Sequence, residues 1–280
     1  MTTTRRRQSG FNIVVFLALM AGAVLAFAPM LYMVGTSFKE NAYVQEIPPE
    51  FIPQKPTLEN FQTALTSRNF GQAFLNSTFV SVATTVLATL LTAMMAYAFA
   101  RFEFVGKNVL FYSMLAMMMV PAMIMIIPQF IMAKNLKLLN SLPGIILVYT
   151  AGPLAFNTFL LRGFFENLPR ELEESALIDG ANHFVIFARI IIPLAAPAVS
   201  TVAVFTFLGA WGEYILALNF LTEESLRTLP IAIANFQGVH STDWGLIFAA
   251  SLTQVVPTVL IFMFFQRYFV QGLTSGAVRG

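Results

Sequence analysis

Residues able to carry out acid–base, nucleophilic or metal chemistry are few in this 280-residue sequence. It has no cysteine, which excludes disulfides, thiolate metal sites and a cysteine nucleophile. Its two histidines, His183 and His240, fall in different predicted loops on opposite sides of a predicted membrane, so they cannot share a metal or an acid–base site. Each is interpreted as a surface residue, and we expect no catalytic residue and no bound metal.

Nucleotide chemistry is also not expected of this chain. A phosphate-cradling G-x-x-x-x-G-K-[ST] loop is absent, because the one Gly-Lys pair, Gly106-Lys107, is followed by asparagine and lacks the earlier glycine. Basic residues form no patch larger than Arg5, Arg6 and Arg7, so the net charge of +2 does not suggest nucleic acid as a partner. We therefore predict a protein that binds neither ATP nor nucleic acid by itself.

Polar residues inside long apolar stretches are the next candidates for function. Glu213 is the clearest, because an ionisable group within a membrane span is costly and commonly faces a cavity. It lies about 28 Å along a helix that begins near Leu194, at 1.5 Å per residue, and beside Trp211. That position favours an interfacial or packing role over a cavity-lining one. Four side-chain amides within the apolar stretches are further candidates to line a solute path, or else form hydrogen bonds between helices. They are Asn157, Gln129, Asn219 and Gln254.

The densest group of carboxylates lies in the segment NLPRELEESALIDGANHFVIFARIIIPLAAP, from Asn167 to Pro197. Asn167 is suited to capping a helix and Pro169 to its first turn. Carboxylates then follow where the positive end of a helix dipole favours them, at Glu171, Glu173 and Glu174. Asp179 and Gly180 predict the end of this short helix and a sharp turn, because glycine adopts the left-handed conformation without steric cost.

A second helix is predicted beyond that turn. Apolar residues recur at helical spacing before Pro193, at Phe184, Phe187, Ile190 and Ile191. This spacing is typical of an amphipathic helix that lies against a membrane. The segment would therefore be a preformed helix, turn and helix, able to transmit a rigid-body movement to the spans on either side. An ordinary acidic loop is the alternative interpretation.

The elements that position these residues are long apolar stretches. Hydrophobic residues make up 57% of the chain and charged residues 11%, against about 25% charged residues in soluble domains. A span needs about 20 largely apolar residues to cross about 30 Å of hydrocarbon. Six stretches satisfy this length, near residues 11–37, 72–99, 108–133, 143–161, 194–219 and 244–266. The sequence therefore predicts an all-α integral membrane protein of about six transmembrane helices.

Basic residues predict the orientation of these spans, because Lys and Arg are preferentially retained on the cytoplasmic side. With the N-terminus inside, ten of the sixteen basic residues lie inside, so both termini are predicted to be cytoplasmic. The first stretch could instead be a cleaved signal peptide, with Ala26 and Ala28 near the cleavage site. Its uncharged run from Phe11 to Phe38 exceeds the roughly 7–15 apolar residues of a signal peptide, which favours a retained anchor. The proline-rich segment from Lys39 to Gly71 predicts an external loop with short helices.

The acidic segment also carries the pattern E-S-A-x-x-D-G-A followed by F-x-x-I-x-x-P. It resembles the signature loop of binding-protein-dependent ABC importer permeases, in which the first three residues are usually Glu-Ala-Ala. The matching positions are Glu174, Ser175, Ala176, Asp179, Gly180 and Ala181. The resemblance extends over about residues 71–266, with further support from LNS at Leu75–Ser77 and AYAFARFEFVGK at Ala96–Lys107. It is nearest to the carbohydrate-uptake branch, of the kind of the smaller permease of the maltose importer.

This resemblance implies a type I ABC importer permease fold with both termini cytoplasmic. Residues 1–70 would form the cytoplasmic N-terminus, the first transmembrane helix and the external loop. Residues 71–266 would form the transmembrane domain, with a cytoplasmic coupling loop at 162–193. Residues 267–280 would form a cytoplasmic tail that does not fold independently. The protein would be a multi-pass component of the cell membrane of a prokaryote.

The resemblance further implies that the chain works within a complex. A second related permease subunit, two cytoplasmic ATPase subunits and an extracytoplasmic solute-binding protein would complete it within the lipid bilayer. ATP and Mg would be used by the ATPase, with no cofactor bound by this chain. Glu174 would make a polar contact in a cleft of the ATPase, Gly180 would allow the turn, and the tail would reach the ATPase dimer. The solute would be a sugar or a related compound.

Two other function classes stay open from the sequence. An ion-coupled secondary transporter would need carboxylates or histidines at the middle of its spans for a relay. A membrane-embedded enzyme would need a convergent set of His, Asp or Glu at one membrane face. Neither set is evident, and ATP-dependent uptake by reconstituted vesicles would distinguish the importer from both.

Overall fold

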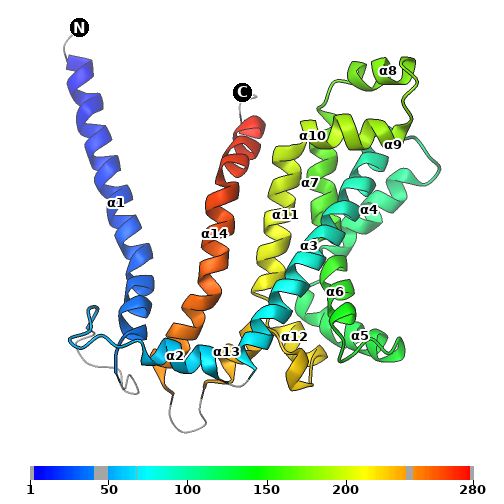
Figure 1. Cartoon of the computed structure of the whole chain (residues 1–280). Helices are drawn as coiled ribbons and strands as arrows, with labels where there is room; N and C mark the ends of the chain where they lie inside the picture. The colour runs from blue at the N-terminus through cyan, green and yellow to red at the C-terminus, as the bar shows by residue number, and fades with distance from the viewer. Residues whose placement is uncertain (1–2, 41–49, 68, 238–241, 278–280) are drawn as a thin grey trace. The chain divides into compact units, whose positions relative to one another are not determined.

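The structure is a computed structural model whose described residues are 3–40, 50–67, 69–237 and 242–277 (Figure 1). Side chains are described from residue 13 to residue 266 within those ranges. The described secondary structure is helical, apart from two isolated β-bridges, Lys39–Pro56 and Gln237–Thr242. The chain divides into two compact units, Met1–Arg68 with Ile233–Gln254 and Asn69–Ala232 with Val255–Gly280.

In the first unit, helix α1 (Thr3–Ser37) is followed by the short helix α2 (Glu59–Thr66). The chain packs closely at the end of α1, where a side chain on Gly35 would place its Cβ 1.9 Å from the carbonyl oxygen of Phe51. Asn60 on α2 donates from Nδ2 to the backbone oxygens of Ser37 at 3.0 Å and Lys39 at 2.8 Å. Helix α2 is thus the short helix predicted for this segment, of which residues 41–49 lie outside the described part.

The second unit is built around helix α3 (Phe70–Arg101), whose 32 residues pack against three other helices. These neighbours are α6 (Leu142–Ala151), α7 (Leu154–Glu166) and α11 (Ala196–Trp211). Alanines dominate the buried face of α3 toward its C-terminal end, including Ala93, Ala96 and Ala100. Small side chains let helix backbones approach closely, which is how helices associate where no hydrophobic effect drives them together.

Three described helices are continuous and apolar enough to cross a membrane. They are the part of α1 from Ile13 to Ser37, the whole of α3, and the part of α14 (Trp244–Ala277) from Trp244 to Gln266. Three further pairs pass the same criterion only together, because each is bent at a short break. The bends are 106° between α4 (Lys107–Met117) and α5 (Ala122–Asn135), 48° between α6 and α7, and 82° between His183–Leu194 and α11. With each pair taken as one span, the described residues hold up to six, as predicted.

The breaks were not predicted, and the fifth predicted span, near residues 194–219, is wrong as a single helix. Helix α11 ends at Trp211 and α12 (Ile215–Phe220) begins three residues later. The carboxylate of Glu213 accepts hydrogen bonds from the backbone N–H groups of Leu216 and Ala217. In a continuous helix these two N–H groups would donate to backbone carbonyls of the preceding turn. Because they donate to the Glu213 side chain instead, a new helix begins at this point.

The remaining helices form the connections and the last span. They are α8 (Glu171–Ile178), α9 (His183–Ile186), the π-helical turn η1 (Phe187–Ile191), α10 (Ile192–Leu194), the 3₁₀ turn η2 (Glu224–Leu226), α13 (Leu229–Ala234) and α14 (Trp244–Ala277). The predicted tail from residue 267 is therefore a continuation of α14 as far as Ala277.

Candidate functional site

The predicted turn between α8 and α9 is present. Gly180 has φ of +84°, and the N–H of Gly180 donates to the Leu177 oxygen at 3.0 Å. The N–H of Ala181 donates to the Ala176 oxygen at 2.9 Å. This pair of bonds is a Schellman motif, which satisfies the last carbonyls of α8 and reverses the chain at the left-handed residue. The predicted helix stop at Asp179 and Gly180 is confirmed.

The start of α8 differs from the prediction. The helix begins at Glu171, and its first turn holds Glu171, Glu173 and Glu174 as expected. Asn167 does not cap it, because its Nδ2 donates back to the Gly163 oxygen at the end of α7, at 2.6 Å. Asn167 thus ends the preceding helix, and three residues separate it from the start of α8.

The second helix of the loop is capped by Asn182, a residue not predicted as a cap. Its Oδ1 accepts the backbone N–H of Val185 at 2.9 Å, as an N-cap residue does. An asparagine two residues after the turn glycine, Gly180, is the signal that identifies this cap. The loop is therefore capped on both sides of Gly180.

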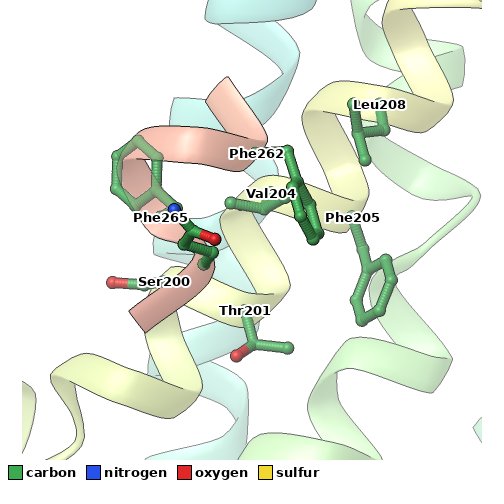
Figure 2. A pocket seen from close by; sticks show the side chains of 8 residues that line it. Ser200, Thr201, Val204, Phe205, Leu208, Phe262 and Phe265 are labelled. Atoms are coloured by element: carbon green, nitrogen blue, oxygen red, sulfur yellow. The ribbon is translucent and has the colours of Figure 1, made fainter. Parts of the chain in front are cut away.

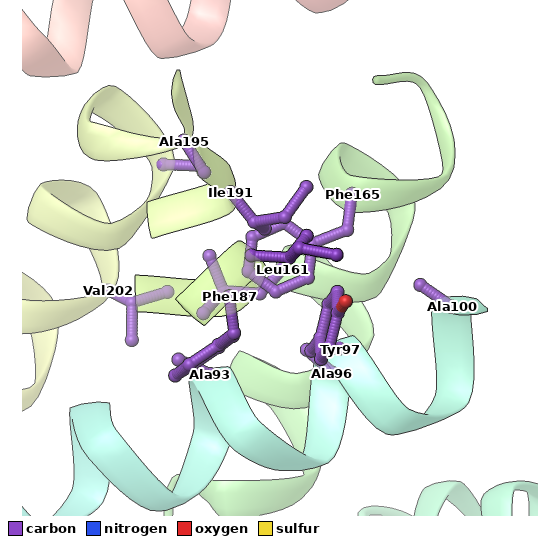
Figure 3. Close-up of a cluster of buried hydrophobic side chains, with 12 residues drawn as sticks. Ala93, Ala96, Tyr97, Ala100, Leu161, Phe165, Phe187, Ile191, Ala195 and Val202 are labelled. Atoms are coloured by element: carbon purple, nitrogen blue, oxygen red, sulfur yellow. The ribbon is translucent and has the colours of Figure 1, made fainter. Parts of the chain in front are cut away.

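The buried face of the second helix is predicted in part, because Phe187 and Ile191 are buried and Ile190 packs against the same cluster. Phe184 is 73% exposed, whereas the buried residues are Ile186, Phe187 and Ile191. These three belong to a hydrophobic cluster with alanines of α3 and with residues of α7 and α11 (Figure 3). The prediction is wrong for Phe184, which is exposed in the short helix α9, where Ile186 is the buried residue.

Helix α8 presents a mixed surface to solvent. Glu174 and Ser175 are exposed, and Ile178 is 87% exposed. Leu172 and Leu177 are each 43% exposed. Exposed apolar side chains next to carboxylates on a short, capped helix form a surface suited to a protein partner.

Glu173 is the exception among the acidic residues of α8, because it is buried. Its Oε1 lies 2.5 Å from Nε of Arg101 at the end of α3, and its Oε2 accepts the hydroxyl of Tyr97 at 3.1 Å. The sequence does not predict this contact, since Glu173 is one of three similar glutamates. No signal within the loop distinguishes it, because both partners lie on α3.

A second feature is a cavity of about 810 Å³ within the second unit. Helices α3 to α7, α11 and α12 contribute to its lining, which is mostly apolar. Its polar lining residues are Gln129, Tyr149, Thr206 and Glu213, and its methionines are Met95, Met114, Met117, Met118 and Met125. Unbranched methionine side chains adapt to irregular shapes, so such a wall can accommodate a solute without a rigid fit.

Glu213 lies at this cavity rather than 28 Å along one unbroken helix. Its Oε1 accepts the N–H of Leu216 at 2.8 Å and its Oε2 accepts that of Ala217 at 3.0 Å. The hydroxyl of Tyr149 on α6 also donates to Oε2. Glu213 therefore caps α12, joins it to α6 and lines the cavity, so the two roles weighed from the sequence coincide.

The other predicted path residues occupy different positions. Asn157 is buried and donates from Nδ2 to Oγ1 of Thr206, which lines the cavity, at 3.0 Å. Asn219 is exposed, donates to the Ile215 oxygen at 2.6 Å and is absent from the cavity lining. Gln254 belongs to the first unit. Glu213 and Gln129 therefore line one cavity, and Asn157 is connected to it only through Thr206.

A smaller pocket of about 80 Å³ lies between α11 and the part of α14 in the second unit (Figure 2). Phe205, Phe262 and Phe265 line it with aliphatic side chains, and Ser200, Thr201 and Gln266 complete it. Its size and apolar character suit a side chain or an acyl chain rather than a polar solute. Among the described residues, no group of three or more His, Cys, Asp or Glu could hold a metal ion.

Comparison with known proteins agrees with the loop pattern. The family model for "Binding-protein-dependent transport system inner membrane component" matches residues 88–275. The diacetylchitobiose uptake system permease protein of Streptomyces coelicolor is 38% identical over 259 residues, which are 92% of this chain and 85% of the relative. The trehalose transport system permease protein of Mycobacterium tuberculosis is 36% identical over 257 residues, 91% of this chain and 93% of the relative.

The fold agrees as well. A crystal structure of a bacterial ABC transporter involved in the import of the acidic polysaccharide alginate matches with a TM-score of 0.84, at 24% identity, over 94% of this chain and 98% of that chain. The resemblance first seen in the loop is confirmed. This chain belongs to the family of binding-protein-dependent transport system inner membrane components, and it is a permease subunit of an ABC importer.

Proposed function

We propose that this subunit forms part of the path of a sugar or a related solute across the cell membrane of a prokaryote. Support comes from relatives whose names specify diacetylchitobiose and trehalose, and from the cavity of about 810 Å³. Glu213 is the path residue that lines this cavity, and Asn157 supports the path by its hydrogen bond to Thr206 on the cavity wall. Asn219 and Gln254 would belong to the path only if other parts of the complex bring solute to them.

A second related permease subunit completes the path, and an extracytoplasmic binding protein delivers the solute. A bacterial alginate ABC transporter is known in complex with a pentasaccharide-bound periplasmic protein, at a TM-score of 0.70 to this chain. Both termini of the present chain are cytoplasmic in this arrangement, because that orientation places most basic residues inside. The continuation of α14 beyond residue 266 then extends toward the ATPase subunits.

Two cytoplasmic ATPase subunits bind ATP and Mg and drive the cycle, while this chain contributes transport and no enzymatic step. Helix α8 docks on one of them through Glu174, Ser175 and Ala176, and the turn at Asp179, Gly180 and Ala181 sets its direction. The observation that carries this proposal is the exposed, acidic and apolar surface of α8 ahead of a Schellman turn. A helix held at both ends is a suitable surface for a rigid partner.

The test is co-purification of a co-expressed ATPase subunit with tagged variants of this chain. Glu174→Arg reverses the charge on the exposed face, and Gly180→Pro cannot adopt a φ of +84°. We expect each to reduce the retained ATPase by roughly tenfold, equivalent to about 1.4 kcal/mol of binding free energy. Glu103→Arg, at a glutamate that is 86% exposed outside α8, is the matched control. Full retention by both loop variants, or uptake that needs an ion gradient and no ATP, would contradict the proposal.

A further inference from the structure

Besides docking, the loop must pass a movement to the helices around the cavity. We propose that Glu173 is a positioning residue that fastens α8 to α3 through Arg101 and Tyr97, and that this linkage conveys the movement of the ATPase to the cavity wall. The inference rests on the proposed docking of α8. It concerns a buried side chain of α8 rather than the exposed Glu174 and Ser175, and residues outside the E-S-A-x-x-D-G-A pattern.

The first observation is burial. Four carboxylates belong to α8 and its cap, and three of them, Glu171, Glu174 and Asp179, are exposed. The side chain of Glu173 is 11% exposed, and that of Arg101 is 6% exposed. A carboxylate is taken out of water at this position only with a compensating charge and hydrogen bonds. The pair therefore selects one orientation of α8 relative to α3.

Arg101 holds two points of the loop at once. Its Nε contacts Glu173, and its Nη2 donates to the backbone oxygen of Leu168 at 3.0 Å. Leu168 precedes α8, whereas Glu173 lies within it. Because the guanidinium is planar and its donors are fixed relative to one another, the two contacts resist rotation of α8 about either one.

Tyr97 connects the same carboxylate with the other arm of the loop. Its hydroxyl donates to Glu173, and its ring lies 5.3 Å from the ring of Phe187, beyond the turn at Gly180. The ring of Phe102, directly after α3, lies 5.0 Å from that of His183 on α9. Both arms of the loop are therefore attached to the C-terminal end of α3.

Helix α3 leads from this attachment to the cavity. Met95, two residues before Tyr97, lines the cavity, and the neighbours α6, α7 and α11 line it too. The covalent connections of α8, by contrast, pass through short non-helical segments that include Gly180. Packed helices move as rigid bodies whereas such connections absorb changes in φ and ψ, so the contact with α3 is the stiffer route.

The test uses the complex with its ATPase subunits and a single-cysteine reporter at the cavity. This chain has no native cysteine, and Gly209→Cys places a thiol on the cavity wall where an added Cβ meets nothing within 4 Å. The rate at which N-ethylmaleimide labels this chain is measured without nucleotide and after trapping with ATP and vanadate. In the parent, we expect the two rates to differ.

Glu173→Gln should keep the rate of ATP hydrolysis within about twofold of the parent. It should reduce the nucleotide-dependent difference in labelling rate roughly fivefold or more, which is the lower end of the effect that typical coupling free energies produce. Tyr97→Phe, which removes only a hydroxyl, should reduce that difference roughly twofold or more. Glu166→Gln is the matched control, since it removes the same charge from an ion pair with Arg162 at 2.8 Å within α7 alone. It should leave both readouts unchanged.

A purely structural role of Glu173 would lower hydrolysis and the labelling difference in equal proportion, and that result overturns the inference. An unchanged labelling difference in Glu173→Gln overturns it as well. If Glu173→Gln does not assemble, Tyr97→Phe decides, and a parental response there rejects the linkage. Failure of the proposed docking is distinguishable, because the parent itself would then retain no ATPase or show no nucleotide-dependent labelling, and both proposals would fall.

Discussion

Two tyrosine–glutamate pairs connect separate helices of this permease, and they compensate a carboxylate in different ways. In the loop pair, Tyr97 and Glu173, the charge is met by the guanidinium of Arg101. In the cavity pair, Tyr149 and Glu213, it is met by two backbone N–H groups at the start of α12. The first pair attaches a loop to a long helix, whereas the second fixes a break between two helices. A similar side-chain pair thus serves an attachment in one place and a helix boundary in the other.

The largest effect is expected where a charge would be left without its partner. Arg101→Met keeps much of the side-chain volume but leaves Glu173 buried beside no cation. Breaking a buried ion pair from one side typically costs about 3–5 kcal/mol. We expect the free energy of unfolding in detergent to fall by about that amount, measured by denaturant titration of the purified chain.

The control for that measurement is Arg162→Met. Its partner Glu166 keeps a side chain that is 44% exposed, so water can solvate the remaining carboxylate. The loss should then be about 1 kcal/mol or less. Equal losses in the two variants would show that Glu173 is no more dependent on its cation than an exposed glutamate.

A smaller effect is expected at the cavity pair. Glu213→Ala removes the acceptor of the Leu216 and Ala217 N–H groups and of the Tyr149 hydroxyl. Loss of a helix-capping side chain costs about 0.5–2 kcal/mol. Because these donors lie beside a cavity, water can replace part of what is lost. Denaturant titration should place this variant between Arg101→Met and the parent, and a loss above that of Arg101→Met would reverse the comparison.

The turn at Gly180 and the burial of Glu173 differ in how far the sequence predicts them. The Schellman turn was predictable, because Asp179 and Gly180 specify it within a few residues. The burial of Glu173 was not, since its contact with Tyr97 joins residues 76 positions apart and the neighbouring Glu174 has the same side chain. The identity of the docking face, the outward side of α8, depends on that contact.

Apolar stretches likewise predicted where the spans lie but not how they are broken. The continuous helices α1, α3 and α14 follow directly from runs of apolar residues. The break before α12 depends on hydrogen bonds from nearby backbone N–H groups to the carboxylate of Glu213. Mean hydropathy over a window of residues cannot predict such a hydrogen bond. The same break, not the overall hydropathy, brings Glu213 to the cavity.

The smallest effect should come from a glutamate paired at the surface. Glu103, between α3 and α4, accepts a hydrogen bond from Nζ of Lys107 at 2.8 Å, which lowers the pKa of the Glu103 carboxyl from its ordinary value of 4.5. A lowered pKa in the folded state contributes stability that is present above 4.5 and lost as the pH falls through the folded-state value. Glu103→Gln should therefore differ slightly from the parent at neutral pH and not at all in strong acid.

Denaturant titrations of both proteins across that pH range would measure the difference, and added salt should diminish it, because exposed charges are screened. The buried pair of Glu173 and Arg101 should respond far less to the same salt. An equal response of the two pairs to salt would mean that water reaches Glu173 as freely as Glu103, and the ion pair with Arg101 would then not be what attaches the loop to α3.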